Sequence, residues 1–378
     1  MVNNNMGAII SCTVGDLVVN FDRMRKPLSS REREKRKGPY PYYGATCIFD
    51  YIDDYIFDGD YILLGEDGTV INKDGSPVLQ RISGKTWVNN HAHVLRNTER
   101  VDYDYLYYAL KNAKFQGAVT GAVQPKISQA NMNAVQVHIH EDILEQKKVA
   151  RYLLTLDQKI NINNRINENL LQQAGAIFNK FYEESPHQQT FTSLISVLGG
   201  GTPKTGNPDF WDGSIPFFTP KDVGAPYTFQ TEKYITESGL THCNSRLYQK
   251  DTTFVTARGT VGKVSLAGTP MAMNQSCYAL ASETIDPLLV YFYVLKAVAA
   301  LKHKASGAVF DAIVTRDFDS ETINILSDDD SKIVLSIIKP MMDTIHNNSQ
   351  ENMRLAALRD SLLPKLMSGE LDVSDINL

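Results

Sequence analysis

Cysteine is scarce in this chain, and no long apolar run is present. The four cysteines among the 378 residues, Cys12, Cys47, Cys243 and Cys277, are far apart and form no CxxC pair. This spacing argues against a zinc ribbon and a disulfide framework, and it favours free thiols. No run of about 18 apolar residues exists. Residues 1–7 have neither the charged n-region nor the apolar h-region of a signal peptide. We therefore expect a cytoplasmic protein that does not enter a membrane.

The motifs of common catalytic sites are also missing. The sequence contains neither a GxSxG nucleophile elbow nor an HExxH zinc motif. Gly201 and Gly206 have the spacing of a phosphate-binding loop, but Asn207-Pro208 stands where that loop needs Lys and Ser or Thr. Without the lysine, the β- and γ-phosphates of a nucleotide have no positive partner there. We expect no catalytic residue in this chain.

Two further patterns are typical of other sites. Residues 207–210 resemble the NPP(F/Y) motif of amino-methyltransferases, but no glycine-rich loop for a methyl donor accompanies them, so we interpret them as a turn. The pairs His91/His93 and His138/His140 each place two imidazoles on one face of a strand, as a metal site requires. Neither pair has an acidic or thiol partner at a recognisable spacing. We interpret them as surface or packed histidines and expect no metal.

Two heptad ladders organise the chain. Apolar residues that alternate in steps of three and four keep one seam on a supercoiled helix, which implies a partner helix. The second ladder repeats the first about 185 residues later, with one substitution, Ala174 to Arg359. The first ladder is Val149, Leu153, Leu156, Ile160, Asn163, Asn167, Leu170, Ala174, Ile177 and Phe181, and the second is Val334, Ile338, Met341, Ile345, Asn348, Asn352, Leu355, Arg359, Leu362 and Leu366.

Both ladders carry two asparagines at seam positions. A buried asparagine needs a polar partner, so it lowers stability and fixes the register of the two helices. An antiparallel pairing that brings Asn163 opposite Asn352 also brings Asn167 opposite Asn348. A parallel pairing would match asparagines too, but the two-fold relation between repeats in one chain favours the antiparallel one. The alternative is two amphipathic helices that pack separately on their own domains.

The repeat also predicts two globular domains of mixed α and β structure. Short apolar runs between turn residues predict strands at 42–49 and 86–96 of the first domain, among others. Pro340 and Pro364 each remove a helix hydrogen bond, so we expect a kink at 336–339 and an unravelled end after Leu363. The expected segments are a first domain at 1–141, a first helix at 142–185, a second domain at 186–327, a second helix at 328–370 and a tail at 371–378.

Charge is unevenly distributed in the first domain. The net charge is −5, which argues against nonspecific coating of nucleic acid. Residues 22–37 hold eight basic and three acidic side chains, and an acidic run without Lys or Arg follows at 50–67. Gly38-Pro39 and Pro41 predict that the basic segment is an irregular loop. Such segregation is typical either of a basic face that binds DNA or of a solvated loop.

Several motifs recur in one known family. Together they resemble the specificity (HsdS) subunits of type I restriction-modification enzymes, over nearly the whole chain. The first domain departs from the family pattern, because it lacks the Thr-Pro…Trp…Pro signature and carries the basic segment instead. The motifs are Thr202-Pro203, WDGSIPF at 211–217, TPKD at 219–222, RGTVGK at 258–263, Asn274-Gln275, QKKVA at 146–150 with Asp157, and LLPKLMSGE at 362–370.

The resemblance implies an α+β fold in which two similar α/β target recognition domains are separated by two long helices that pack as an antiparallel coiled coil. Each domain is expected to read one half of a split DNA sequence. The implied partners are double-stranded DNA, DNA methyltransferase (modification) subunits that carry S-adenosylmethionine, and restriction/translocase subunits that use ATP and Mg. The chain itself is expected to hold no cofactor and to catalyse nothing.

Arg and Lys are the expected DNA contacts, because they pair with guanine O6 and N7 or with phosphates. Two other functions remain open from the residues alone, a self-contained DNA methyltransferase and a coiled-coil scaffold with two protein-binding heads. The candidate contacts are Arg23, Arg25, Lys26, Arg36, Lys37 and Lys126 in the first domain, and Lys204, Lys221, Arg258 and Lys263 in the second.

Overall fold

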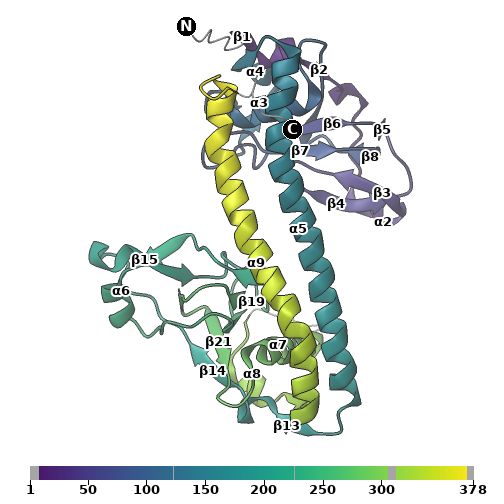
Figure 1. The fold of residues 1–378 in the computed structure, drawn as a ribbon. Coiled ribbons are helices and arrows are strands. Elements are labelled where there is room, and N and C mark those ends of the chain that lie inside the picture. Colours follow the sequence, from purple (N-terminus) through teal and green to yellow (C-terminus); the bar gives the residue numbers. More distant parts are fainter. Residues whose placement is uncertain (1–7, 122, 225, 305–311, 373–378) are drawn as a thin grey trace. The chain divides into compact units, whose positions relative to one another are not determined.

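The computed structural model describes residues 8–121, 123–224, 226–304 and 312–372. The chain divides into two compact units, Met1–Ile160 with Arg354–Leu378, and Asn161–Met353. Two long helices, α5 (Ile143–Glu184) and α9 (Asp328–Met367), each contribute one part to each unit (Figure 1). Of the expected tail, residues 373–378 lie outside the described residues. Within the described ranges, no helix is both long and apolar enough to cross a membrane.

The first unit contains two four-stranded sheets, one of which is covered by helix α3 (Tyr103–Asn112). Asp102 begins this helix, because its carboxylate accepts hydrogen bonds from the N–H groups of Asp104 and Tyr105 at 3.0 and 3.1 Å. Tyr105 and Leu106 then pack on Ile62 in the main core of the unit. In order, the sheets are β2 (Val18–Asn20), β9 (Ala92–Asn97), β6 (Tyr61–Gly65) and β7 (Leu79–Ile82), and β4 (Ile48–Ile52), β3 (Lys37–Tyr43), β8 (Lys85–Val88) and β5 (Phe57–Asp58).

The smaller elements of this unit join these sheets to the long helices. Strand β12 leads directly into α5 and pairs with β1 in an antiparallel sheet of two strands. These elements are β1 (Ile9–Thr13), α1 (Val14–Leu17), α2 (Ser30–Glu34), α3 (Tyr103–Asn112), β10 (Val119–Thr120), β11 (Lys126–Ile127), α4 (Gln129–Asn133) and β12 (Gln136–His140).

Three local predictions for the first unit are wrong. The expected strand at 42–49 is a hairpin, since the chain reverses between β3 and β4 and the Gly44 N–H donates to the Cys47 carbonyl at 2.9 Å. The expected strand at 86–96 is split at Asn89, whose side chain accepts from the His91 N–H. The basic segment contains helix α2 and the start of β3, because Ser29 caps α2 through the Glu32 N–H. Short-range turn and cap bonds override the apolar pattern at these places.

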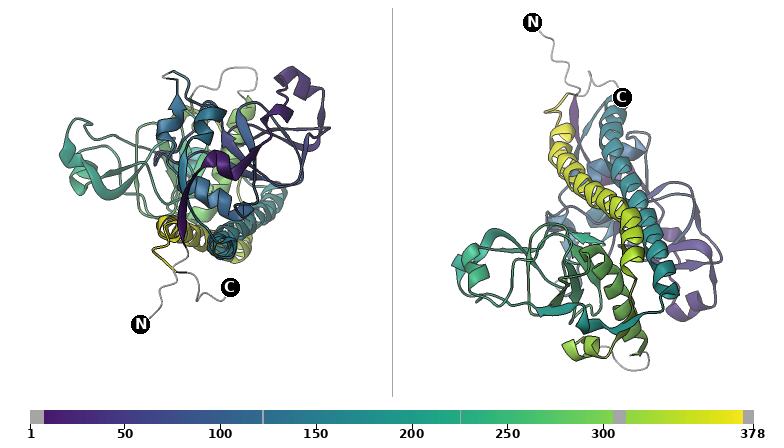
Figure 2. Two further views of the ribbon diagram at one scale, coloured as in Figure 1. Left: turned by 90° about the horizontal axis from the view of Figure 1, so that it is seen from above. Right: turned by 60° about the horizontal axis from the view of Figure 1, so that its bottom comes forward.

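The second unit also contains two main sheets. A five-stranded sheet is covered by helix α7 (Pro287–Lys304), whose buried face includes Leu289 and Tyr293. A three-stranded sheet carries the segment that begins at Trp211. The part with β15 and α6 projects away from α7 (Figure 1 and Figure 2). In order, the sheets are β14 (Ser196–Gly199), β21 (Cys277–Ala281), β18 (Thr253–Thr256), β19 (Val264–Ala267) and β16 (Tyr227–Thr228), and β17 (Lys233–Ile235), β15 (Trp211–Phe218) and β20 (Ala272–Met273).

The second unit repeats the way in which the first unit meets its helices. Strand β22 leads into α9 and pairs with β13, as β12 leads into α5 and pairs with β1. Helix α7 corresponds to α3 in the repeat. The remaining elements are β13 (Gln188–Thr190), α6 (Glu237–Thr241), α7 (Pro287–Lys304), α8 (Thr315–Asp319) and β22 (Thr322–Asn324).

The long helices pack on each other within both units. In the first unit, Val149 near the start of α5 shares a core cluster with Leu366 near the end of α9. In the second unit, Phe178 near the end of α5 shares a cluster with Val334 near the start of α9. The helices are therefore antiparallel, as expected, and the alternative of two separately packed helices is wrong.

The seam asparagines lie opposite each other in the second unit. The Asn163 amide donates to the Asn352 amide oxygen at 2.9 Å and to the Glu351 carboxylate at 2.7 Å. The Asn348 amide donates to the Asn167 amide oxygen at 2.9 Å. Asn163 is almost completely buried. Because a buried amide without a partner is costly, a shift of one helix along the other would leave both pairs unsatisfied.

Neither proline ends helix α9. The helix is continuous through Pro340 and Pro364 and ends at Met367, so the expected unravelling after Leu363 is wrong. Leu363, Leu366 and Met367 are all buried in the core of the first unit. Burial of this last apolar turn compensates for the hydrogen bond that Pro364 removes. At Pro340, where a kink was expected, helix α9 continues without a break.

Breaking one amide pair is expected to cost more than removing the pair. Asn352→Ala removes one of the two acceptors of the buried Asn163 amide, which keeps the Glu351 carboxylate, and should lower the free energy of unfolding by about 0.5–1.5 kcal/mol. The double variant Asn163→Leu with Asn352→Leu should be as stable as the natural chain or more stable, because two apolar residues then meet in the seam. Urea unfolding followed by circular dichroism measures both. Glu168→Ala, on the exposed face of α5, is the control, and equal losses for the single and double variants would contradict the expectation.

Candidate nucleic-acid interface

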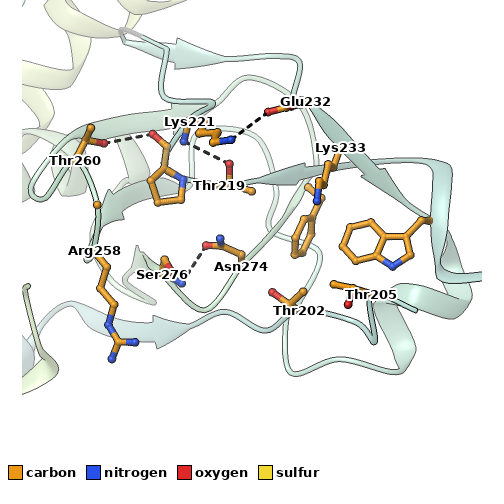
Figure 3. A pocket seen from close by; sticks show the side chains of 14 residues that line it. Thr202, Thr205, Thr219, Lys221, Glu232, Lys233, Arg258, Thr260, Asn274 and Ser276 are labelled. Atoms are coloured by element: carbon orange, nitrogen blue, oxygen red, sulfur yellow. Dashed lines mark hydrogen bonds and ion pairs between the residues drawn. The ribbon is translucent and has the colours of Figure 1, made fainter. Parts of the chain in front are cut away.

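Loops of the second unit surround a hollow of about 740 Å³. Its walls come from segments far apart in the sequence, the loop at Thr202, strand β15 at Trp211, the turn at Lys221, the loop at Arg258 and the loop at Asn274 (Figure 3). Each of these segments carries one of the motifs on which the family resemblance rests. The fold thus gathers the scattered motifs of this domain around one open site.

Glycines allow these loops to approach closely. A Cβ atom on Gly200 would lie 2.2 Å from the Asn274 carbonyl oxygen, and one on Gly201 would lie 2.6 Å from the Asn244 backbone nitrogen. Gly259, beside Arg258, has a φ of +80°, which L side chains rarely adopt. The glycines of this domain are therefore needed where two backbones meet and where the Arg258 loop turns.

Positive charge lies at both ends of the hollow. Arg258 is exposed at one end in the view of Figure 3, and Lys233 lies at the other. The Lys233 ammonium is 5.4 Å from the centre of the Trp211 ring, within the range of a cation–π contact. Lys221 faces Glu232 at 4.0 Å, a distance at which an exposed ion pair is weak. An anionic ligand that spans the hollow would meet a cation at either end.

Polar side chains between these charges are held by local hydrogen bonds. The Asn274 amide oxygen accepts from the Ser276 N–H at 3.0 Å, and the Thr202 hydroxyl donates to the Gln275 amide oxygen. Asp222 accepts from the Thr219 N–H and hydroxyl at 2.8 and 2.6 Å, so it shapes the turn that carries Lys221. Fixed amide and hydroxyl groups of this kind suit hydrogen bonding to base edges.

The sequence-predicted cations of the second domain separate into two groups. Lys221 and Arg258 line the hollow together, whereas Lys204 and Lys263 are exposed outside its described lining. Sequence reasoning missed Lys233 at this site. Its position two residues before Ile235 in a short strand gave no signal, since only the pairing of β17 with β15 brings it over Trp211.

Arg25 of the first unit is used internally. Its guanidinium donates to the Glu66 carboxylate and to the Ala92 carbonyl, both at 2.6 Å, and it lies 3.3 Å from Asp22. Only 12% of the side chain is exposed. A guanidinium that is this enclosed and this fully bonded has no free edge for DNA, which argues against the expected role of Arg25.

Other cations of the first domain meet the acidic run. Arg36 pairs with Asp53 at 2.9 Å, and Lys37 pairs with Asp50 at 2.6 Å, because β3 and β4 are neighbouring strands. Lys126 pairs with Glu66 at 3.1 Å. The charges that are segregated along the sequence are therefore partly neutralised across the hairpin. Arg23 and Lys26 are exposed and have no ion-pair partner among the described residues.

His93 and His140 are packed and His138 is exposed, as interpreted from the sequence, but the fold also brings Asp67 to His91 and Asp22 to His93. His93 is buried, with Nδ1 2.6 Å from Asp22 and Nε2 2.9 Å from the Ile127 carbonyl oxygen. The side chains of Asp22, Glu66 and His93 together form a group of possible metal ligands. The Arg25 guanidinium already contacts both carboxylates, so positive charge is supplied by the protein and the group does not need a cation.

This buried group perturbs the titration of its acids. Burial favours the neutral form of Asp22, but hydrogen bonds from His93 and from the Val94 N–H outweigh it and lower the pKa of the carboxyl. Burial acts in the same direction on Glu66, and the hydrogen bond from Arg25 together with nearby positive charge lowers its pKa. Both acids are thus stabilised in their ionised form in the folded chain.

The two repeats correspond to known family domains. A family model described as the type I restriction modification DNA specificity domain matches the chain twice, over residues 12–172 and 190–356. These matches cover most of the chain. The chain belongs to this family. The resemblance inferred from the sequence is thereby confirmed, and the two alternatives, a self-contained methyltransferase and a protein-binding scaffold, find no support.

Two relatives of this specificity family match parts of the chain. The putative type I restriction enzyme specificity subunit S.HindORF215P of Haemophilus influenzae is 34% identical over 125 residues, which are 33% of this chain and 31% of the relative. The type I restriction enzyme MjaIX specificity subunit of Methanocaldococcus jannaschii is 27% identical over 162 residues, or 41% of this chain and 38% of the relative. The matched segments thus span about a third of these relatives.

A solved structure shares the fold over the full length. The type I restriction-modification S subunit from M. genitalium superposes with a TM-score of 0.61 at 15% identity, covering 97% of this chain and 98% of that one. At this identity the likeness concerns the fold alone. It agrees with two mixed α and β domains joined by two long antiparallel helices, which confirms the predicted fold class.

Acid is expected to weaken the first unit through Asp22 and Glu66. Because both pKa values are lowered, these carboxylates stabilise the fold fully above the pKa values of the unfolded chain, about 3.9 for Asp and 4.3 for Glu, and lose this contribution as the pH falls through the folded values. Asp22→Asn should therefore flatten the fall in stability below about pH 4. Urea unfolding at stepped pH measures it, with exposed Asp60→Asn as the control. An unchanged pH profile for Asp22→Asn would contradict this account.

Proposed function

We propose that this chain is the DNA-reading subunit of a type I restriction-modification complex and that each of its two domains contacts one half of a bipartite target. The observation that carries the proposal is the hollow of the second unit, where family motifs, exposed cations and fixed polar groups meet at one site. We assign the two target recognition domains to residues 1–141 and 186–327, and the helical segments between them to 142–185 and 328–370.

In the second domain, Arg258 is the proposed base reader. It is exposed at the rim of the hollow, it lies beside Asn274 and Ser276, and its guanidinium can donate two parallel hydrogen bonds to guanine. Lys221 and Lys233 are proposed to hold phosphates, since an ammonium group acts as a point charge without a fixed bonding plane. Lys204 and Lys263 remain candidates for backbone contacts outside the hollow.

In the first domain, Arg23 and Lys26 are the stronger candidates. They are exposed and unpaired within the described chain, whereas Arg36, Lys37 and Lys126 must first give up their carboxylate partners. Exposed ion pairs contribute only about 0–1 kcal/mol, so phosphates can compete for these three side chains. Arg25 is not among the proposed DNA contacts, because Asp22 and Glu66 enclose its guanidinium.

The proposed partners follow from the family. We propose that modification subunits with S-adenosylmethionine and restriction subunits with ATP and Mg assemble on this chain, which itself contributes recognition and no catalysis. Because no catalytic motif accompanies the hollow, the methyl transfer and strand cleavage would be left to those subunits. Such an assembly would act on DNA in the cytoplasm.

The base-reading role of Arg258 can be tested directly. Arg258→Ala should weaken binding of the assembled complex to its target by about 1–3 kcal/mol and relax the preference at one base position. Lys233→Ala should weaken binding to all DNA sequences alike and reduce the dependence of the affinity on salt concentration. Binding to a library of variant duplexes measures both effects. Arg316→Ala, exposed on α8 of the same unit, is the matched control, and an Arg258→Ala complex with unchanged affinity and preference would refute the assignment.

The helix pair is proposed to set the gap between the half-sites. Removing one heptad from each helix at opposing positions shortens the pair by about 10 Å at about 1.5 Å per residue. The recognised gap should shrink by about 3 base pairs at about 3.4 Å per step, while both half-sites stay the same. Mapping of methylated positions in cells that carry the shortened chain measures the gap. A gap of unchanged length would show that the helices do not measure it.

A further inference from the structure

The two helix seams are alike at their polar centre. In the repeat, Asn163 of α5 corresponds to Asn348 of α9, and Asn167 corresponds to Asn352. The same amide–amide pairs could therefore form between α5 and α9, between two copies of α5, or between two copies of α9, although the Glu351 carboxylate that Asn163 also contacts has Ile166 as its counterpart in α5. The amides fix how two helices are aligned, but they do not determine which helix is the partner.

One ion pair breaks this equivalence. In the first unit, Arg359 of α9 donates to the Asp157 carboxylate of α5, and the other oxygen of Asp157 accepts from the Tyr108 hydroxyl at 2.6 Å. The two charged side chains are only 15% and 20% exposed. Arg359 also contacts Asp360 at 2.8 Å, while Lys111 lies 3.8 Å from Asp360 at the edge of the group. Charges with so little access to water depend on their partners.

The corresponding place in the second unit is apolar. The counterpart of Asp157 is Met342 and that of Arg359 is Ala174, and both are fully buried in the hydrophobic cluster of the second unit. Tyr293, the counterpart of Tyr108, has its hydroxyl bonded to the Leu326 N–H at 3.0 Å. One repeat thus holds a charge pair where the other holds two apolar side chains.

We propose that Asp157 and Arg359 select the partner helix, favouring α5 with α9 over α5 with the α5 of a second copy of this chain. In a pair of like helices with the same register, Asp157 would face Ala174 of the second copy, and Arg359 would face Met342. Asp157 would keep the Tyr108 hydroxyl but lose its cation, and Arg359 would keep Asp360 but lose its buried partner, so each charge would lie against an apolar side chain. Only the pairing of unlike helices joins both charges and leaves Met342 and Ala174 in an apolar seam.

The order of synthesis makes this choice matter. Helix α5 is complete at Glu184, whereas α9 begins at Asp328, after the whole second domain. At about 5–20 residues per second, α5 waits on the order of ten seconds for its partner. During that time the nearest available seam is the α5 of a neighbouring nascent chain. This inference depends on the repeat and on the packing within each unit, and it does not depend on DNA recognition.

The test compares two double variants of the full chain. Asp157→Met with Arg359→Ala copies the apolar pair of the second unit into the first and should remove the selection. Asp157→Arg with Arg359→Asp keeps an ion pair between unlike helices and should preserve it. Two differently tagged copies of each chain are unfolded together, refolded together and captured through one tag. We expect at least tenfold more mixed species for the apolar variant than for the natural chain, and no increase for the charge-exchanged variant.

Two results would overturn the proposal. One is an apolar variant that folds with no more mixed species than the natural chain, and the other is an equal rise in both variants. If the apolar variant does not fold, Ala174→Arg with Arg359→Ala decides the question. That exchange places the guanidinium that Asp157 needs in the α5 of a second copy, so mixed species must form, and their absence would refute the selection.

Discussion

The antiparallel pairing of α5 and α9 is the constraint on which the rest of the structure depends. Each unit contains one end of both helices, so neither core is complete until the two distant segments meet. The buried amides allow one alignment, because any shift would leave a polar group without a partner in an apolar seam. The pairing therefore completes both cores in a single register. The proposed role of Asp157 and Arg359 is to favour the pairing of α5 with α9 over the pairing of α5 with a second α5.

The two domains are built on one plan but differ in the use of charge. In the first unit, neighbouring strands bring basic and acidic side chains together, and Arg25 is enclosed among Asp22, Glu66 and a backbone carbonyl. In the second unit, Arg258 stays exposed at the rim of the hollow and forms no ion pair within the part of the chain that the structure describes. Arg25 is thus enclosed by acids, whereas Arg258 stays accessible to a ligand.

Backbone approach is what makes the hollow of the second unit. Gly200 and Gly201 let the Thr202 loop pass within contact of the segments at Asn274 and Asn244, where any side chain would collide with backbone atoms. The motifs that looked like separate signatures in the sequence are parts of one arrangement. Their spacing in the chain reflects the strands between them, and the site exists only where their loops converge.

The sequence by itself determined the helix pair, its antiparallel sense and the family, because a heptad pattern is local and a repeat within one chain carries its own symmetry. It could not determine the strand boundaries at Gly44 and Asn89, since single turn bonds interrupted an unbroken apolar pattern. It also could not determine which cations are available. Tertiary structure alone decided that Arg36 meets Asp53 and that Lys233 reaches Trp211, because ion pairs and ring contacts form between strands whose neighbours are fixed only by folding.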